Sequence, residues 1–300
     1  MELDEEQMVA VDSKESQVVV AGPGSGKTRV LTEKARALFE KGEDILCLTF
    51  TRSAAREMQS RVPGLPASTI HSYCCGGVGW DEAWGYEGLL YRFLNTTDKR
   101  RFSWVLLDEA QDVNALELDV VLSLVGDKLF AVGDPYQSIY GFQGAMGPKV
   151  ITFLESMGCR KIDLRNNYRS SPEIVSRLNR WFNRGLISKN IKQTGLTYML
   201  FRKNEDLFFV SSFLKKRGVP HGVRLSAEYG ANREYNVIGL SSTKLMTIHC
   251  SKGHEADRVL LFDWYPDGEP EEMRVMYVAM ARASQEFKEV RTLEGLIKLL

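Results

Sequence analysis

The stretch VVVAGPGSGKTRVL, residues 18–31, decides the fold expected for the first part of this chain. Its three valines are β-branched and apolar, which predicts a short buried strand. From Thr28 onward apolar residues recur at helical spacing, and Gly42 supplies a stop for that helix. The loop between them has few side chains, so several backbone N–H groups can point inward at the positive end of the helix. The stretch therefore predicts a loop that binds a polyphosphate.

Single residues of this loop have definite expected roles. Lys27 would reach the β- and γ-phosphates of a nucleotide, and the Thr28 hydroxyl would bind Mg²⁺. The usual pattern begins with glycine, whereas Ala21 occupies that position here. The alternative interpretation is a glycine-rich turn that contains a lysine by chance. The residues expected to contact the nucleotide in this loop are Gly22, Pro23, Gly24, Ser25, Gly26, Lys27, Thr28 and Arg29.

Composition limits the class of protein. A chain of 300 residues is long enough for two domains. Its 44% hydrophobic and 26% charged residues describe a soluble globular protein. Lys+Arg and Asp+Glu both number 39, so the formal charge is zero. Any basic groove for nucleic acid must therefore be local.

The cysteines and the N-terminus bear on the cellular compartment. None of the five cysteines has the paired C-x-x-C spacing of a zinc site, and no disulfide framework is indicated. This favours a reducing compartment. The N-terminus MELDEEQMVA is acidic and lacks the apolar run of a signal peptide, and no stretch approaches a membrane-spanning length. We expect a cytoplasmic protein with no membrane partner.

Short apolar runs alternate with amphipathic stretches along the chain. This pattern is typical of an α/β fold with a parallel sheet and helices on both of its faces. We expect the unit to occur twice, as domains 1–150 and 151–300. Residues 74–101 and 226–242 fit neither pattern and are expected to be surface excursions. The expected strands are 18–20, 45–50, 104–108 and 128–134 in the first domain and 161–164, 197–202, 244–249 and 258–262 in the second.

A second motif, WVLLDEAQD (104–112), ends an apolar strand in two adjacent carboxylates. At the carboxyl edge of a parallel sheet they would face the phosphate-binding loop. Asp108 would hold Mg²⁺, and Glu109 would orient or deprotonate an attacking water. The alternative is a solvated acidic turn. A kinase does not need the second carboxylate as a water base, so the pair favours a nucleotide hydrolase.

Together, DEAQD and AGPGSGKT resemble the motifs of the superfamily 1 helicases of the UvrD/Rep/PcrA type. Further motifs of that family follow in the family's order from about residue 3 to residue 283. They are LDEEQMVAV (3–11), LTFTRSAAREM (48–58), STIHSYC (68–74), AVGDPYQSIYGFQGA (131–145), LRNNYRSS (164–171), LMTIHCSKGHEADRVLL (245–261) and EEMRVMYVAMARA (271–283). The resemblance implies two tandem RecA-like P-loop domains with a nucleotide site in the cleft between them.

The resemblance also implies roles around the nucleotide. Arg169 and Arg282 match the two arginine fingers of the family, which complete the γ-phosphate site when the domains close and so couple hydrolysis to motion. Taken alone, each arginine is more commonly a surface ion pair. Gln137 matches the residue that senses the γ-phosphate. The remaining nucleotide contacts implied are Gln7 with the adenine, Tyr168 stacked on it, and Glu255 with the ribose.

The resemblance implies that the protein binds single-stranded DNA and moves along it. Phe50, Tyr140 and Phe142 stand where the family stacks or wedges bases, although each alone would more often pack in a core. With a neutral composition, the groove should be narrow and sensitive to salt. The residues implied to hold the phosphate backbone are Arg52, Thr69, His71, Thr247, His249 and Ser251.

The sequence departs from the pattern of the family that it resembles in several places. The segments from Ser72 to Asp108 and from Leu225 to Leu245 are too short for the two large accessory insertions. Within the first, a tryptophan is a possible wedge at a duplex junction, and the candidates are Trp80 and Trp84. Phe142 replaces a usual tryptophan, Gln143 a usual arginine and Ala281 a usual threonine. These changes affect coupling between ATP and DNA rather than hydrolysis.

The sequence thus predicts an ATP-dependent helicase that uses ATP and Mg²⁺ and moves 3′→5′ on single-stranded DNA as a monomer, acting at junctions with duplex. One alternative is a single-strand translocase with weak or no unwinding. Another is a nucleotide-dependent clamp that binds DNA without productive turnover. The compact form is compatible with a phage-encoded protein that acts in the host cytoplasm.

Overall fold

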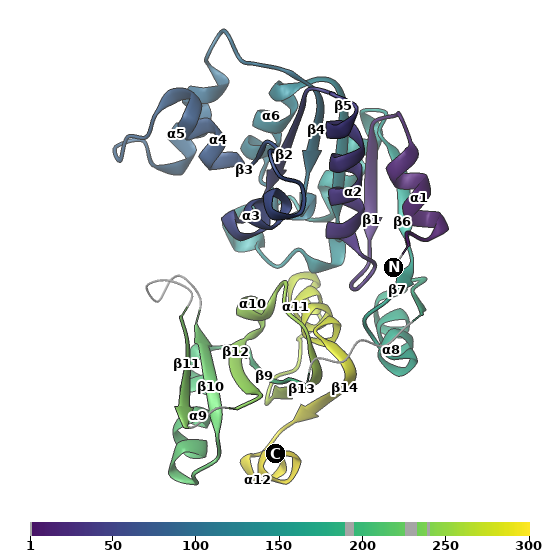
Figure 1. Ribbon diagram of the computed structural model, residues 1–300. Helices are drawn as coiled ribbons and strands as arrows, with labels where there is room; N and C mark the ends of the chain where they lie inside the picture. Colours follow the sequence, from purple (N-terminus) through teal and green to yellow (C-terminus); the bar gives the residue numbers. More distant parts are fainter. Residues whose placement is uncertain (1, 190–194, 226–232, 239–240) are drawn as a thin grey trace. The chain divides into compact units, whose positions relative to one another are not determined.

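The computed structural model describes residues 2–189, 195–225, 233–238 and 241–300 (Figure 1). The chain divides into two compact units, Met1–Arg165 and Asn166–Leu300. The boundary expected after residue 150 falls instead inside a helix, α7 (Pro148–Ser156). That helix leads to strand β6 (Arg160–Leu164), which was expected in the second domain but pairs in parallel with β1 (Gln17–Ala21) of unit 1. Because β6 completes the first sheet, α7 and β6 belong to unit 1, and the boundary lies after Arg165.

Within the described residues, the strands of unit 1 form one parallel sheet in the order β3-β2-β4-β5-β1-β6. β1 is buried along its whole length, as an apolar run covered on both faces requires. The expected strands of this domain are confirmed, and β3 is additional. The other bounds are β2 (Ile45–Thr49), β3 (Ala67–Thr69), β4 (Phe102–Leu107) and β5 (Val125–Gly133).

Helices cover both faces of this sheet and make two separate cores (Figure 1). Val19 and Ala21 of β1 point into the core shared with the first three helices, whereas Val18 and Val20 point into the core shared with the later four. The helices are α1 (Glu5–Asp12), α2 (Lys27–Glu40), α3 (Arg52–Arg61), α4 (Ile70–Val78), α5 (Gly85–Leu94), α6 (Ala115–Leu124) and α7, with 3-10 turns η1 (Ala110–Asp112), η2 (Pro135–Gln137) and η3 (Gly141–Gln143).

Residues 74–101 are not the irregular excursion that we expected. They contain the end of α4 and all of α5, which lie beyond the β3 edge of the sheet (Figure 1). Leu89, Leu90 and Phe93 of α5 are buried in the core of unit 1. The five glycines of the segment conceal this helical apolar pattern in the sequence.

Unit 2 has a second sheet in the order β11-β10-β12-β9-β13-β14, parallel except for the β10–β11 pair. The expectation for 226–242 is wrong for 233–238, which form β11, whereas 226–232 and 239–240 lie outside the described residues. A short β7–β8 pair is separate. The strands are β7 (Asn166–Asn167), β8 (Ile187–Ser188), β9 (Thr197–Phe201), β10 (His221–Leu225), β11 (Arg233–Ile238), β12 (Thr243–Thr247), β13 (Ala256–Phe262) and β14 (Ala283–Val290).

The helices of unit 2 pack on this sheet and continue the α/β pattern. Leu207, Val210 and Leu214 of the helix after β9 are buried in one core with residues of β9, β10, β12 and β13. The helix that precedes β14 is buried from Val275 to Ala281. The helices are α8 (Pro172–Phe182), α9 (Asn204–Lys216), α10 (Ile248–Ser251), α11 (Pro270–Ala281) and α12 (Leu293–Leu299).

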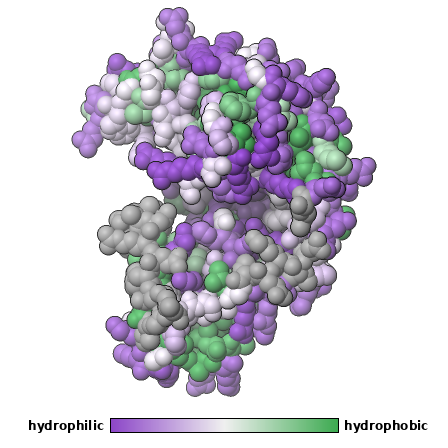
Figure 2. Space-filling view, viewed as in Figure 1, coloured by the Kyte–Doolittle hydropathy of each residue, from purple (hydrophilic) through white to green (hydrophobic). Residues whose placement is uncertain are grey.

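Hydrophilic side chains dominate the face seen in Figure 2, where hydrophobic ones form small separate patches. All five cysteines are free thiols. Among the described helices, none combines the length and apolar character needed to cross a membrane.

Candidate active site

The order of strands in unit 1 decides which loops meet. Carboxyl ends of parallel strands lie at one edge of a sheet, and ligands of such sheets bind there. β1, β5 and β4 are neighbours, so the loops that follow Ala21, Gly133 and Leu107 are adjacent. β2 and β3 come next, and they lead into Phe50 and Ile70. In unit 1, the loops that carry nucleotide candidates and those that carry DNA candidates therefore share one edge of one sheet.

The phosphate-binding loop is held in shape by its own hydrogen bonds and by α1. The Ser25 hydroxyl donates to Gly22 O at 2.7 Å, and Gln7 Nε2 donates to Ser25 O at 2.8 Å. Gly26 has φ +83°, and a Cβ there would lie 2.8 Å from Gln7 Nε2. Gln7 is 2% exposed, and its Oε1 accepts from Asp4 N. The side chain predicted to contact the adenine thus also supports the loop.

The ammonium of Lys27 lies among carboxylates. Lys27 Nζ is 3.2 Å from Glu109 Oε2. Burial by itself lowers the pKa of Lys27, but the negative charges of Glu109, Asp134 and Asp108 outweigh burial, so the pKa is raised. Lys27 therefore stays cationic, which suits a group that binds phosphate.

Asp108 is a buried carboxyl group in an excess of negative charge. Burial and the charge of Glu109 raise its pKa to about 7, although Lys27 and the Glu109 N–H oppose the shift. A divalent cation beside Asp108 would stabilise its ionised form. The oxygen donors of Asp108 and Thr28 suit Mg²⁺, which typically takes few protein ligands and completes its shell with water and substrate phosphates. No cluster of three or more His, Cys, Asp or Glu side chains able to hold a metal occurs in the described parts of the chain.

Glu109 is held in an uncommon backbone conformation. Its φ is +49°, which few residues other than glycine adopt. Its N–H donates to Asp108 Oδ1 at 2.9 Å, and its Oε2 accepts from Gln111 Nε2 at 2.7 Å. The turn aims the Glu109 carboxylate at Lys27, where the phosphate would be bound.

Gln111 and Asp134 belong to this site, although the sequence analysis gave them no role. Gln111 Oε1 accepts from Asp134 N at 2.8 Å, and Asp134 Oδ2 accepts from Gln137 Nε2 at 2.8 Å. A Cβ on Gly133 would lie 2.6 Å from Gln111 Oε1, so the sheet needs glycine there. A hydrogen-bonded chain thus runs from Glu109 to Gln137. Both residues stand inside quoted motifs, which was the available signal.

The loop that contains Gln137 continues to the predicted aromatic residues. Phe50 and Tyr140 stack with ring centroids 5.5 Å apart and planes at 22°. Tyr140 meets Phe142 edge-on at 6.1 Å. Phe50 is 37% and Phe142 64% exposed. The structure thus brings these three together as an aromatic surface, not as core residues.

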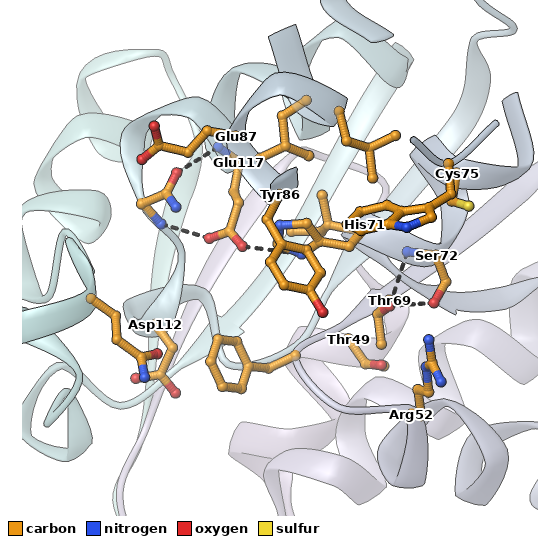
Figure 3. A pocket seen from close by; sticks show the side chains of 17 residues that line it. Thr49, Arg52, Thr69, His71, Ser72, Cys75, Tyr86, Glu87, Asp112 and Glu117 are labelled. Carbon is orange, nitrogen blue, oxygen red and sulfur yellow. Dashed lines mark hydrogen bonds and ion pairs between the residues drawn. The ribbon is translucent and has the colours of Figure 1, made fainter. Parts of the chain in front are cut away.

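A cavity of about 920 Å³ lies next to this surface, at the carboxyl ends of β2 and β3 (Figure 3). The predicted DNA contacts of unit 1 line this cavity, except for Tyr140 and Phe142, which belong to the loop that follows β5. Trp80, one of the two candidate wedge residues, lines it as well, together with Tyr86 and Glu117, for which the sequence predicted no DNA contact. The predicted contacts among its lining residues are Phe50, Arg52, Thr69 and His71.

In unit 2 the two predicted arginine fingers lie in one cluster. Arg169 Nε donates to Glu255 Oε2 at 2.7 Å, and its Nη1 donates to Ala281 O at 3.3 Å. The next residue, Arg282, is 1% exposed and donates to Val278 O and His254 O, both at 3.1 Å. Glu255 and Arg282 immediately precede the paired strands β13 and β14. Tyr168 is half-buried beside Arg169.

The predicted DNA contacts of unit 2 lie at the carboxyl end of β12, whereas Glu255 and Arg282 lie at the amino ends of β13 and β14. Thr247 caps α10 by accepting from Cys250 N, as Thr69 caps α4 by accepting from Ser72 N. His249 follows within the same helical turn. Ser251 is fully buried, and its hydroxyl donates to Ile248 O at 2.6 Å. Ser251 therefore supports the turn rather than presenting its hydroxyl at the surface.

Two protein families match this chain, each over a part. Residues 4–143 match the family described as an AAA domain. Residues 223–287 match the UvrD-like helicase C-terminal domain. The two matches lie in unit 1 and unit 2 respectively.

Individual relatives agree with these family matches. DNA helicase II of Salmonella typhimurium is 34% identical over 128 residues, which is 39% of this chain and 18% of that protein. DNA helicase IV of Escherichia coli is 27% identical over 256 residues, 69% of this chain and 37% of that protein. The chain therefore spans less than half of the length of these relatives.

Solved structures share the fold at low sequence identity. An arterivirus nonstructural protein 10 helicase in complex with DNA has a TM-score of 0.54 at 15% identity, covering 98% of this chain and 64% of its own. Pif1 helicases at forked DNA give 0.53 at 16% identity, covering 100% and 96%. The expected fold of two α/β, RecA-like domains is confirmed.

Proposed function

Because this chain belongs to the superfamily 1 helicases of the UvrD/Rep/PcrA type, we propose that it is an ATP-dependent DNA helicase that moves on single-stranded DNA. The observation that carries the proposal is the chain of contacts from Lys27 through Glu109, Gln111 and Asp134 to Gln137. It joins the phosphate-binding loop to the loop that also contains the exposed aromatic residues.

In the proposed reaction Lys27 binds the β- and γ-phosphates, and backbone N–H groups of residues 22–28 bind the remaining phosphate oxygens. Thr28 and Asp108 would hold Mg²⁺, whose positive charge would offset the charge that develops on the phosphate. Glu109 orients an attacking water and accepts its proton. When Lys27 binds phosphate, the Glu109 carboxylate binds this water in place of Lys27. Gln111 continues to donate its hydrogen bond to the Glu109 carboxylate.

Gln137 is the proposed sensor of the γ-phosphate. A change in its position would act on Asp134, to which its amide donates at 2.8 Å, and on the loop that continues to Tyr140 and Phe142. These two rings, of which Tyr140 stacks on Phe50 and Phe142 meets Tyr140 edge-on, would then shift against the bases of the strand. Base stacking on aromatic rings tolerates any sequence, as a translocating motor requires.

We also propose that Arg169 and Arg282 of unit 2 supply the positive charge that completes the γ-phosphate site. Both guanidinium groups are preorganised, because each donates to main-chain carbonyl groups and Arg169 pairs with Glu255. Arg282→Lys keeps the charge but loses the planar donor set. We expect it to lower ATP turnover by about 10³-fold with ATP binding retained, while Arg291→Ala, at an exposed position of unit 2, has no effect.

The direct test is ATP hydrolysis with and without single-stranded DNA. Turnover by the unaltered protein should rise steeply with DNA. Glu109→Gln should bind both ligands yet lose roughly 10²–10⁴-fold in turnover. Lys27→Ala should lose turnover and most ATP binding, whereas Lys41→Ala, at the other end of α2, should behave like the unaltered protein. Bound ATP with turnover unchanged by DNA would instead establish a clamp that does not cycle.

A translocase with weak unwinding is the second candidate function. It is favoured by the small size of the insertion between β3 and β4, where the structure has only α4 and α5 among its described helices. A duplex with a 3′ single-stranded tail and a fluorophore pair separates the two functions. Strand release indicates a helicase, while displacement of a protein block without strand release indicates a translocase. Repeating the assay with a 5′ tail tests the proposed 3′→5′ direction.

A further inference from the structure

We propose that the cavity of unit 1 holds one nucleotide of the DNA strand in a fixed orientation, with its base against Trp80 and Tyr86 and the amino edge of that base toward Glu117. This inference rests on the proposed function and adds a base preference to it. The cavity volume of about 920 Å³ lies in the range of pockets that enclose small organic ligands. It therefore has room for a nucleotide with its sugar and phosphate.

The aromatic wall comes from the ends of α4 and α5. Trp80 is 48% and Tyr86 67% exposed, and their ring centroids are 5.3 Å apart with planes at 50°. Tyr86 in turn meets His71 edge-on at 5.1 Å. Exposed rings that touch only at a tilt leave faces free for a base to stack on. Trp84, the other tryptophan of this segment, instead packs under Arg92, whose guanidinium lies 4.1 Å from its ring.

Charge divides the cavity into two sides. Glu117 and Asp112 lie on one side in Figure 3, whereas Arg52, Thr69 and Ser72 lie on the other. A phosphate is repelled by the carboxylates and attracted by the guanidinium and hydroxyl groups. The base of the same nucleotide must then lie toward the carboxylates. The distribution of charge thus sets the orientation of the nucleotide.

Glu117 is the residue placed to read the base. Its side chain is 9% exposed, and its Oε2 accepts from Asn114 N at 2.8 Å. Its Oε1 lies 3.6 Å from His71 Nδ1, which is longer than a normal hydrogen bond. An ionised carboxylate only accepts hydrogen bonds. Cytosine and adenine offer an exocyclic amino donor, while thymine offers a carbonyl oxygen that the carboxylate repels.

The test compares binding of dye-labelled oligo(dC) and oligo(dT) of equal length by fluorescence anisotropy at fixed salt. In a homopolymer every register places the same base in the cavity. The unaltered protein should bind oligo(dC) about threefold to tenfold more tightly. Glu117→Gln should reduce this ratio to about one, because an amide can donate as well as accept. Glutamine also keeps the capping contact at the start of α6.

A second pair of variants tests the aromatic wall independently. Trp80→Ala should weaken binding of both oligonucleotides by about fivefold to a hundredfold. Tyr91→Ala is the matched control, since Tyr91 is an exposed aromatic residue of α5 outside the cavity lining. Equal affinity of the unaltered protein for the two homopolymers, or a preference that survives Glu117→Gln, overturns the inference. Failure to bind either oligonucleotide would reject the proposed function itself.

Discussion

Replacing Gln111 by methionine is the sharpest probe of the link between the nucleotide loops. Gln111 is fully buried. Its amide donates to Glu109 Oε2 at 2.7 Å and to Asp112 Oδ2 at 3.1 Å, and it accepts from Asp134 N at 2.8 Å. Methionine has a similar volume but makes none of these contacts. The substitution therefore removes the middle of the chain while leaving the packing nearly unchanged.

The size of the effect follows from these contacts. Leaving the buried Asp134 N–H without its acceptor costs about 1–3 kcal/mol, and losing the donor to the charged Glu109 costs a similar amount. The free energy of unfolding should fall by roughly 2–6 kcal/mol. ATP turnover should fall as well, because Glu109 loses the partner that orients it. DNA should then stimulate the remaining turnover much less than in the unaltered protein.

Gln17 provides a control with the same substitution in the same unit. It is also fully buried, in β1, but neither polar atom of its amide has a hydrogen-bond partner among the described residues. Gln17→Met should therefore leave the free energy of unfolding unchanged or raise it. Urea unfolding and DNA-stimulated ATP hydrolysis measure both variants. If the two substitutions have the same effect on stability, or Gln111→Met keeps full stimulation by DNA, the proposed link is refuted.

Two further predictions concern the phosphate-binding unit. Gly26→Ala should cost stability and ATP affinity, since φ is +83° and the new Cβ lies 2.8 Å from Gln7 Nε2. Gly42→Ala, with φ +76° and nothing within 4 Å, should cost only the backbone strain of about 1–2 kcal/mol. The second prediction concerns Lys34, which is buried against Trp104 and donates to Val11 O and Ser13 O. Burial and the charge of Lys41 lower the pKa of Lys34 to about 8, although the charge of Asp12 opposes this shift. Between about pH 8 and its ordinary pKa of 10.5 the unfolded chain holds this proton while the folded chain releases it, so stability should rise with pH by at most about 3 kcal/mol. Urea unfolding at several pH values should show a shallower rise for Lys34→Met, and equal slopes would contradict this account.

Local signals of the sequence were sufficient for much of the first domain. The strand, loop and helix of residues 18–31 are adjacent in the chain, so valine branching, glycine openness and helical spacing act without distant partners. DEAQD likewise follows its strand directly. The motif order identified the family, and the structure places Lys27 against Glu109 across 82 positions of sequence as the shared sheet edge requires.

The tertiary structure alone decided the features that depend on partners far along the chain. β6 belongs to unit 1 because Val18 pairs with Lys161, and no local pattern records such a pairing. The helical character of 85–94 depends on its burial against α6, which outweighs its glycines. The contacts of Gln111 with Glu109 and Asp134 follow from the tertiary structure, whereas the sequence shows Gln111 only as one residue of a motif. The sequence offered Trp80 and Trp84 equally as wedge candidates, and the structure shows that of these two Trp80 lines the cavity. Hydrophobic spacing specifies an element, but strand order and side-chain contacts specify which chemical groups meet.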